Sequence, residues 1–151
     1  MIDVGSPFPE FELQDQTGQT RTKTDFLGSP TVYYFYPKDD TPGCTKEACG
    51  FRDRMPALQG ATVVGVSPDG VASHQKFAQK FGLEFPLLAD VEQKLAQACG
   101  VWVEKSMYGK KYMGIERSTF LVDSEGIVRK VWRKVKPEGH AEEVEEALRS
   151  L

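Results

Sequence analysis

The feature that most constrains the fold is an unbroken run of strand-forming residues at positions 31–36, Thr-Val-Tyr-Tyr-Phe-Tyr. Its two faces are both largely apolar, which is typical of a strand in the middle of a sheet that is covered on both sides. A second such run, Ala-Thr-Val-Val-Gly-Val-Ser at 61–67, follows a segment with the pattern of a helix from Cys44 to about residue 58. Two buried strands joined through a helix predict parallel strands in an α/β sheet.

The other segments complete a mixed sheet with helices on its faces. An N-terminal β-hairpin is expected from residues 10–13 and 19–23, and a second hairpin from residues 118–122 and 127–132. The remaining expected elements are helices at 71–81, 91–99 and 138–151, an extended segment at 85–88 and a flexible loop at 104–114. At 151 residues, with no repeat or linker, the chain is expected to form one domain over 1–151.

Composition narrows the class of partners. The net charge is −3, so nothing favours nucleic acid or an anionic membrane as a partner. No apolar run approaches the roughly 20 residues of a membrane span, and the first residues lack the basic and apolar stretches of a secretory signal. Three cysteines are too few for a secreted disulfide scaffold, so we expect a cytoplasmic chain with reactive thiols.

One cysteine lies where a helix is expected to begin. Thr41 can serve as the N-cap and Pro42 as the first helical residue, which places Cys44 at the third helical position. Free backbone N–H groups and the helix dipole favour a thiolate there, and the thiolate is the nucleophilic form. The alternative is a buried structural thiol.

The pattern Pro37-x-x-x-Thr41-x-x-Cys44 resembles the active-site signature of the peroxiredoxins, which are thiol peroxidases of thioredoxin-like fold. Cys49, five residues after Cys44, is similar to the second cysteine of the branch called peroxiredoxin Q or bacterioferritin comigratory protein. Arg117 opens a further matching segment, Arg-Ser-Thr-Phe-Leu-Val-Asp, and the likeness covers nearly the whole chain. The resemblance selects the thioredoxin-like fold, with an N-terminal hairpin extension, among the possible α/β folds.

The resemblance implies a mechanism that needs no metal, haem or flavin cofactor. Cys44 attacks hydrogen peroxide or an organic hydroperoxide, Cys49 captures the sulfenic acid, and a thioredoxin-like reductant reopens the disulfide. Thr41 is expected to orient the peroxide and Arg117 to stabilise the developing charge. Pro37 would shield the nucleophile from water. Glu47, three residues after Cys44, is a candidate for orienting Arg117 through an ion pair.

The spacing of the two cysteines sets a geometric condition. In an intact α-helix, residues i and i+5 have Cα atoms roughly 8.6 Å apart. A disulfide tolerates about 4.4–6.8 Å. Cys44 and Cys49 therefore cannot bond while the segment is helical, and we predict that residues 42–52 unwind after oxidation.

Several alternatives stay open at this stage. A protein disulfide oxidoreductase would normally carry Cys-x-x-Cys, which is absent from the chain, and a redox-sensing binding module would oxidise without turnover. Cys99 is expected in the core, with an auxiliary resolving role as the alternative. A resolving thiol in the same chain makes a dimer unnecessary, so we expect a monomer. The preferred hydroperoxide and the electron donor are not specified by the residues.

The two histidines and the basic residues are expected to have no catalytic role. His74 and His140 fall on expected helices, and we predict surface positions for both. Neither forms a zinc pattern with the cysteines. A basic run at 129–136 is followed at once by acidic residues, so a solvated, acid-paired face is expected there.

Overall fold

A five-stranded sheet forms the centre of the computed structural model, which describes residues 2–58 and 60–151. The strand order is β5-β4-β3-β8-β9, with β3, β4 and β5 parallel and β8 and β9 antiparallel to their neighbours. The strands are Thr31–Phe35 (β3), Thr62–Ser67 (β4), Leu87–Ala89 (β5), Ser118–Val122 (β8) and Val128–Trp132 (β9). The mixed α/β sheet predicted from the sequence is confirmed.

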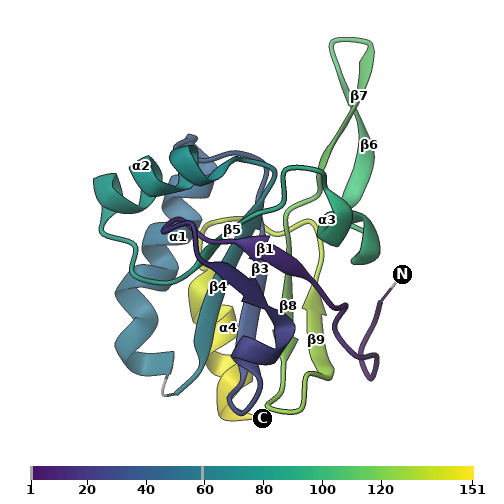
Figure 1. Ribbon diagram of the computed structural model, residues 1–151. Coiled ribbons are helices and arrows are strands. Elements are labelled where there is room, and N and C mark those ends of the chain that lie inside the picture. Colours follow the sequence, from purple (N-terminus) through teal and green to yellow (C-terminus); the bar gives the residue numbers. More distant parts are fainter. Residues whose placement is uncertain (1, 59) are drawn as a thin grey trace.

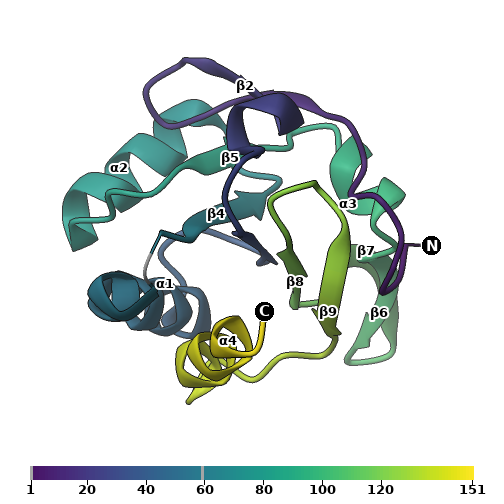
Figure 2. The ribbon, with the colours of Figure 1, turned by 90° about the horizontal axis from the view of Figure 1, so that it is seen from below.

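Helices cover both faces of this sheet. The α-helices are Pro42–Arg54 (α1), Val71–Phe81 (α2), Lys94–Ala98 (α3) and His140–Arg149 (α4), and short 3-10 helices are formed by Lys23–Phe26 (η1) and Met55–Leu58 (η2). Seen along the sheet, α1 and α4 lie side by side on one face, and the N-terminal segment with η1 covers the other (Figure 2). The sequence-based prediction of helices on both faces is confirmed.

The central strand β3 separates two hydrophobic cores. All five of its residues are buried, and successive side chains of a strand point to opposite faces. Val32 and Tyr34 pack in the core beneath α1, α2 and α4. Tyr33 and Phe35 pack in the opposite core, with residues of the N-terminal segment and α3. Burial of each large apolar side chain stabilises the fold by about 1.5–3 kcal/mol. Because all of its side chains are buried, β3 is a rigid support for the loop that follows it.

The N-terminal hairpin is present, and several helix bounds are shorter than predicted. Strands Glu12–Gln14 (β1) and Thr20–Thr22 (β2) pair antiparallel. Helix α1 begins two residues before Cys44 and gives way to η2, because Pro56 has no N–H to donate within an α-helix. The C-terminal helix begins at His140 rather than at residue 138, since Gly139 adopts a left-handed conformation with φ of 72°.

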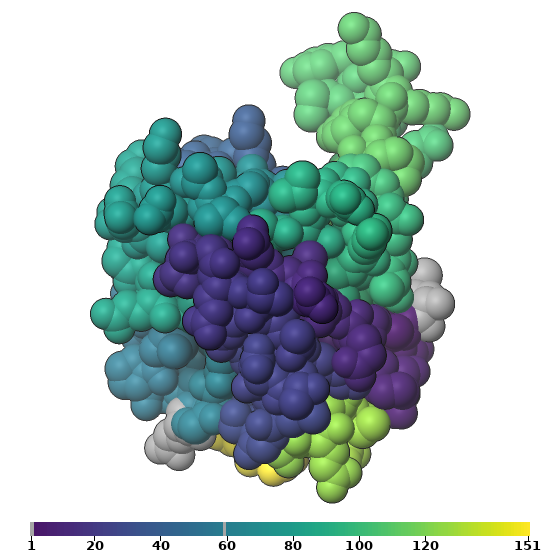
Figure 3. All heavy atoms as spheres, in the orientation of Figure 1, coloured from purple at the N-terminus to yellow at the C-terminus, as the bar shows by residue number. Residues whose placement is uncertain are grey.

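The prediction of a flexible loop at 104–114 is wrong. The segment forms a hairpin of strands Trp102–Met107 (β6) and Lys110–Ile115 (β7), which projects from the body of the molecule (Figures 1 and 3). Its two-residue turn needs positive φ at both positions, and Tyr108 (52°) and Gly109 (78°) provide them. Tyr-Gly is not a usual sequence for such a turn, so the hairpin signal is weak in the sequence.

Among the described residues, no helix is both long and apolar enough to cross a membrane.

Candidate active site

The thiol of Cys44 lies in the first turn of α1, where the sequence predicts it. Thr41 is the N-cap residue, Pro42 opens the helix, and Cys44 is the third helical residue with 1% of its surface exposed. The Thr41 hydroxyl does not cap the helix, contrary to expectation; it donates instead to the Lys38 carbonyl at 2.8 Å. Because no side chain caps the free N–H groups of the first turn, their partial positive charge is available to stabilise a thiolate at Cys44.

Arg117 reaches this thiol from the residue that precedes β8. Its Nη2 donates to the Sγ of Cys44 at 3.2 Å, and its Nη1 donates to Oε1 of Glu47 at 2.7 Å. Arg117 is 73 positions from Cys44 in the sequence, and the antiparallel pairing of β8 with β3 brings the two together. One guanidinium therefore holds the sulfur and a carboxylate at once.

Glu47 is an unusual partner because it is almost fully buried. Burial raises its pKa to about 7, although the charge of Arg117 and the hydrogen bond from it act in the opposite direction. Its second oxygen, Oε2, has no hydrogen-bond partner among the residues that the structure describes. Burial also acts against the charge of Arg117, but Glu47 and Cys44 outweigh it and raise the pKa of the guanidinium. The orienting ion pair that the sequence analysis considered is present.

Two residues of the site were not singled out from the sequence. A side chain at Gly43 would place its Cβ 3.2 Å from Nη2 of Arg117, so the bare glycine gives the guanidinium its path to the sulfur. Lys105, on the projecting hairpin, has its pKa lowered first by burial and then by the charge of Arg117. Nothing in the sequence indicated that Gly43 or Lys105 is near Arg117, because Gly43 was one residue of a turn motif and Lys105 was expected in a loop.

The other two cysteines lie in different surroundings. Cys49 is in the middle of α1, half-buried, and all three cysteines are free thiols. The helix is intact over both Cys44 and Cys49, as expected for the reduced form. Cys99 is fully buried in the core of the opposite face, and burial raises its pKa, with Asp90 adding to the shift. Pro37 is the second residue after β3 and is half-buried.

The prediction of surface positions for the histidines is wrong. His74 is 0% exposed and His140 is 1% exposed. His140 Nε2 lies 2.8 Å from Oγ1 of Thr119, and its ring packs edge-on against Phe51 and Trp132. Both imidazoles have polar partners in the interior, which amphipathic patterns in the sequence do not reveal.

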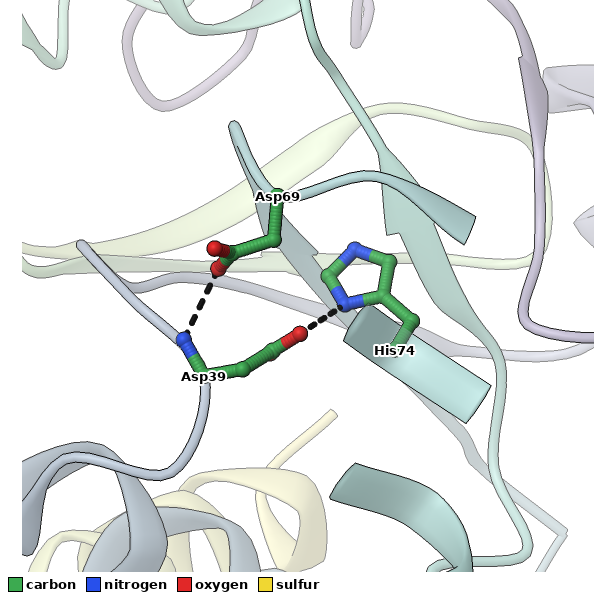
Figure 4. Close-up of side chains that lie close together, drawn as sticks. All are labelled: Asp39, Asp69 and His74. Atoms are coloured by element: carbon green, nitrogen blue, oxygen red, sulfur yellow. Dashed lines mark hydrogen bonds and ion pairs between the residues drawn. The ribbon is translucent and has the colours of Figure 1, made fainter. Parts of the chain in front are cut away.

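His74 belongs to a cluster with Asp39 and Asp69 beside the motif (Figure 4). Its Nδ1 lies 2.6 Å from Oδ2 of Asp39, and Asp69 Oδ2 accepts from the backbone N–H of Asp39 at 2.8 Å. The three groups are close enough to bind a metal ion. However, the ligand atoms are already engaged in hydrogen bonds, and a cation would have to break several of them, so the donor set does not fit a metal.

The chain is similar to several known proteins. Residues 4–131 match the model of the AhpC/TSA family. The chain is 49% identical to peroxiredoxin Bcp of Bacillus subtilis, over 99% of this chain and 97% of that protein. The bacterioferritin comigratory protein of Xanthomonas campestris, solved as a trapped intermediate or ligand complex, has a TM-score of 0.89 and 46% identity over 93% of this chain and 90% of that one. A PrxQ mutant of Xylella fastidiosa gives a TM-score of 0.93 at 38% identity, over 99% of this chain and 97% of that one.

Proposed function

The chain belongs to the AhpC/TSA family and is a peroxiredoxin, a thiol-dependent peroxidase, and from this premise we propose that Cys44 is its peroxidatic cysteine. The observation that carries the assignment is the contact of the Cys44 sulfur with Arg117 at the start of α1. A guanidinium and a helix N-terminus both stabilise a thiolate, and of the three cysteines, all of which the structure describes, Cys44 is the one with both.

The first step is displacement at a peroxide oxygen. The Cys44 thiolate forms a bond to the terminal oxygen, the O–O bond breaks, and the departing oxygen takes up a proton and leaves as water or an alcohol. Arg117 stabilises the negative charge that moves from sulfur to this oxygen, since it already lies against the sulfur. Thr41 orients the peroxide, and Pro37 limits the access of water.

The second step forms a disulfide within the chain. The Cys49 sulfur attacks the sulfenic sulfur of Cys44, and the hydroxyl group leaves with a proton as water. Because both residues lie in one continuous helix, the first turns of α1 must unwind before the sulfurs meet. A dithiol protein of the thioredoxin type then supplies two electrons by attacking Cys49, which releases Cys44 as the better leaving group.

Because these steps are complete within one chain, we propose that the protein is a monomer. We also propose that it is located in the cytoplasm. The substrates are hydrogen peroxide and organic hydroperoxides. No partner subunit is required, because the resolving thiol is on the same helix as the nucleophile.

The assignment is tested by intact mass and peptide mapping after one equivalent of hydrogen peroxide. We expect a loss of two hydrogens, mapped to a bridge between Cys44 and Cys49, and no reaction in Cys44→Ser. A bridge from Cys44 to Cys99, or an external thiol requirement, would overturn the role of Cys49. Peroxide consumption by Cys44→Ser at the wild-type rate would overturn the assignment of the nucleophile.

A further inference from the structure

The loop before α1 is tied to the rest of the fold through one buried carboxylate, that of Asp39. Its Oδ1 accepts from the Tyr36 hydroxyl at 2.6 Å, and its Oδ2 accepts from Ser73 Oγ at 2.8 Å and lies 2.6 Å from Nδ1 of His74. The backbone N–H of Asp39 donates to Asp69 (Figure 4). Asp69 also accepts from the hydroxyl of Ser67. Asp39 is 7% exposed and His74 is 0% exposed, so these bonds are shielded from water.

The hydrogen-bond partners of His74 determine how many protons the pair holds. Its Nε2 lies 3.0 Å from the carbonyl oxygen of Leu88, which can only accept, so Nε2 carries a proton. Its Nδ1 faces the carboxylate of Asp39, and that contact needs a second proton. Because the carboxylate already accepts from Tyr36 and Ser73, the second proton belongs on the ring. His74 and Asp39 therefore form a buried imidazolium–carboxylate pair.

The residues that bond to Asp39 and to the side chain of Asp40 all lie outside α1. Ser73 and His74 are in the first turn of α2, and Asp69 follows β4. Asp40, the next residue, has a left-handed backbone with φ of 57° and pairs with Lys80 near the end of α2 at 2.9 Å. None of these side-chain bonds would be lost if α1 unwound from its first turn.

We propose that His74 is a positioning residue for peroxide reduction, which acts by holding Asp39 so that Pro37 and Thr41 keep their places in the loop that leads to Cys44. This inference rests on the proposed function. The Thr41 hydroxyl bonds within the same segment, to the carbonyl of Lys38, so its orientation follows the position of Asp39. The loop stays on α2 when α1 unwinds, and it gives the refolding helix its starting geometry after each cycle.

Two isosteric variants separate the contacts of His74. The amide nitrogen of His74→Asn falls near the position of Nδ1 and can still donate to Asp39, whereas that of His74→Gln falls near Nε2 and reaches only Leu88. Both variants lose most of the ring, so the difference between their rate constants reports the effect of the bond to Asp39. The measurements are the second-order rate constant for Cys44 oxidation by hydrogen peroxide, the rate constant for disulfide formation, and the thiolate absorbance of Cys44 against pH.

We expect His74→Gln to slow Cys44 oxidation by about tenfold or more, as for other misplaced reactive groups, while His74→Asn restores most of the rate. The thiolate titration of Cys44 should be the same in both variants. Equal losses in both, or wild-type rates in His74→Gln, would overturn the inference. Ser73→Ala, which removes a smaller contact to the same carboxylate, is a second variant if His74→Gln does not fold, and its oxidation must also be slower.

The wild-type protein separates this inference from the proposed function. Wild-type protein that fails to consume hydroperoxide would overturn the proposed function itself. Wild-type consumption together with unaffected variants would overturn the role of His74 alone. Nuclear magnetic resonance of the ring gives an independent check, since both nitrogens of His74 should carry the protons that they donate to Asp39 and Leu88. A ring with a proton on only one nitrogen would contradict the pair described here.

Discussion

Glu47 and Arg117 form a buried ion pair with 2.7 Å between Oε1 and Nη1, and the same guanidinium donates to the sulfur of Cys44. One guanidinium therefore bonds to both the carboxyl group of Glu47 and the sulfur of Cys44 inside the protein. A negative charge on Glu47 competes with the thiolate for Arg117, and it also fixes the guanidinium in the orientation that reaches the sulfur. The effects of substitutions at the site depend on which of these two roles is removed.

Replacing Arg117 by lysine tests the need for a planar group. Lysine keeps a positive charge but has a single nitrogen, which cannot donate to Cys44 and Glu47 from two fixed positions at once. We expect Arg117→Lys to lower the second-order rate constant with hydrogen peroxide by about 10²-fold. The measurement is stopped-flow oxidation of the reduced protein.

The control for this prediction is Arg129→Lys. Arg129 is an exposed arginine that pairs with Asp123 on the far strand β9, away from the thiol. The rate constant of Arg129→Lys with hydrogen peroxide should equal that of the wild type. A rate for Arg117→Lys within threefold of the wild type would contradict the shared-guanidinium mechanism.

Glu47 should make stability depend on pH. Its pKa is raised from 4.5 to about 7 in the folded protein, mainly by burial, so the folded state binds its proton more tightly than the unfolded state does. The stability that this proton provides is present at low pH and is lost as pH rises from about 4.5 through 7. The free energy of unfolding of the wild type, minus that of Glu47→Gln, should fall across this range by up to about 1.4 kcal/mol per pH unit, and then level off.

Denaturant titrations of the wild type and Glu47→Gln at four pH values between 5 and 8 give this difference. The matched control is Glu146→Gln, at an exposed position of α4, whose difference from the wild type should not vary in the same way. A pH-independent difference for Glu47→Gln would show that the buried carboxyl titrates normally.

The roles of the remaining cysteines are separated by single substitutions. Cys49→Ser should consume one equivalent of peroxide and then stop cycling with a thioredoxin-type reductant, because no resolving thiol is left on α1. Cys99→Ala should cycle at the wild-type rate, since Cys99 is fully buried and burial raises its pKa, which disfavours the thiolate. Coupled turnover assays measure both, and loss of cycling in Cys99→Ala would contradict this division of roles.

The sequence was a good guide to the parts of the fold that follow local patterns. The buried strand before Pro37 and the helix start at Cys44 were predicted because apolar runs and turn residues are local signals. Arg117 was found through a resemblance, since nothing in its own neighbourhood indicates a contact 73 positions away. The burial of His74 was missed because it depends on Asp39, a residue outside α2, whose carboxylate is the polar partner of the ring.

The hairpin β6–β7 was missed for a related reason. Its strands are mostly exposed, so they lack the alternation of apolar and polar residues that a half-buried strand shows. Four large apolar side chains of this hairpin, at Met107, Tyr108, Tyr112 and Met113, are exposed. In the sequence, such a segment with Gly109-Lys110-Lys111 at its centre is indistinguishable from a loop.

The bare backbone at Gly43 gives the last prediction. A methyl group there would lie 3.2 Å from Nη2 of Arg117 and 3.4 Å from Cγ of Pro137, which is tighter than ordinary contact. The guanidinium would have to shift by a few tenths of an ångström, which would disturb its 3.2 Å contact with the sulfur. At the same time, alanine is favoured over glycine in a helix by about 1 kcal/mol. We therefore expect Gly43→Ala to keep or raise the melting temperature while the rate of Cys44 oxidation falls.

Gly50→Ala is the matched control, because Gly50 is on the same helix and its added Cβ would meet only the Cβ of Ala141 at 3.5 Å. Both variants gain helix propensity, but only the change at Gly43 touches Arg117. Oxidation rates and melting temperatures of the two variants separate the effects of helix stability and guanidinium position. Equal oxidation rates would mean that Arg117 tolerates the shift. A slower oxidation rate for Gly50→Ala alone would contradict the explanation through guanidinium position, because the added methyl group there does not meet Arg117.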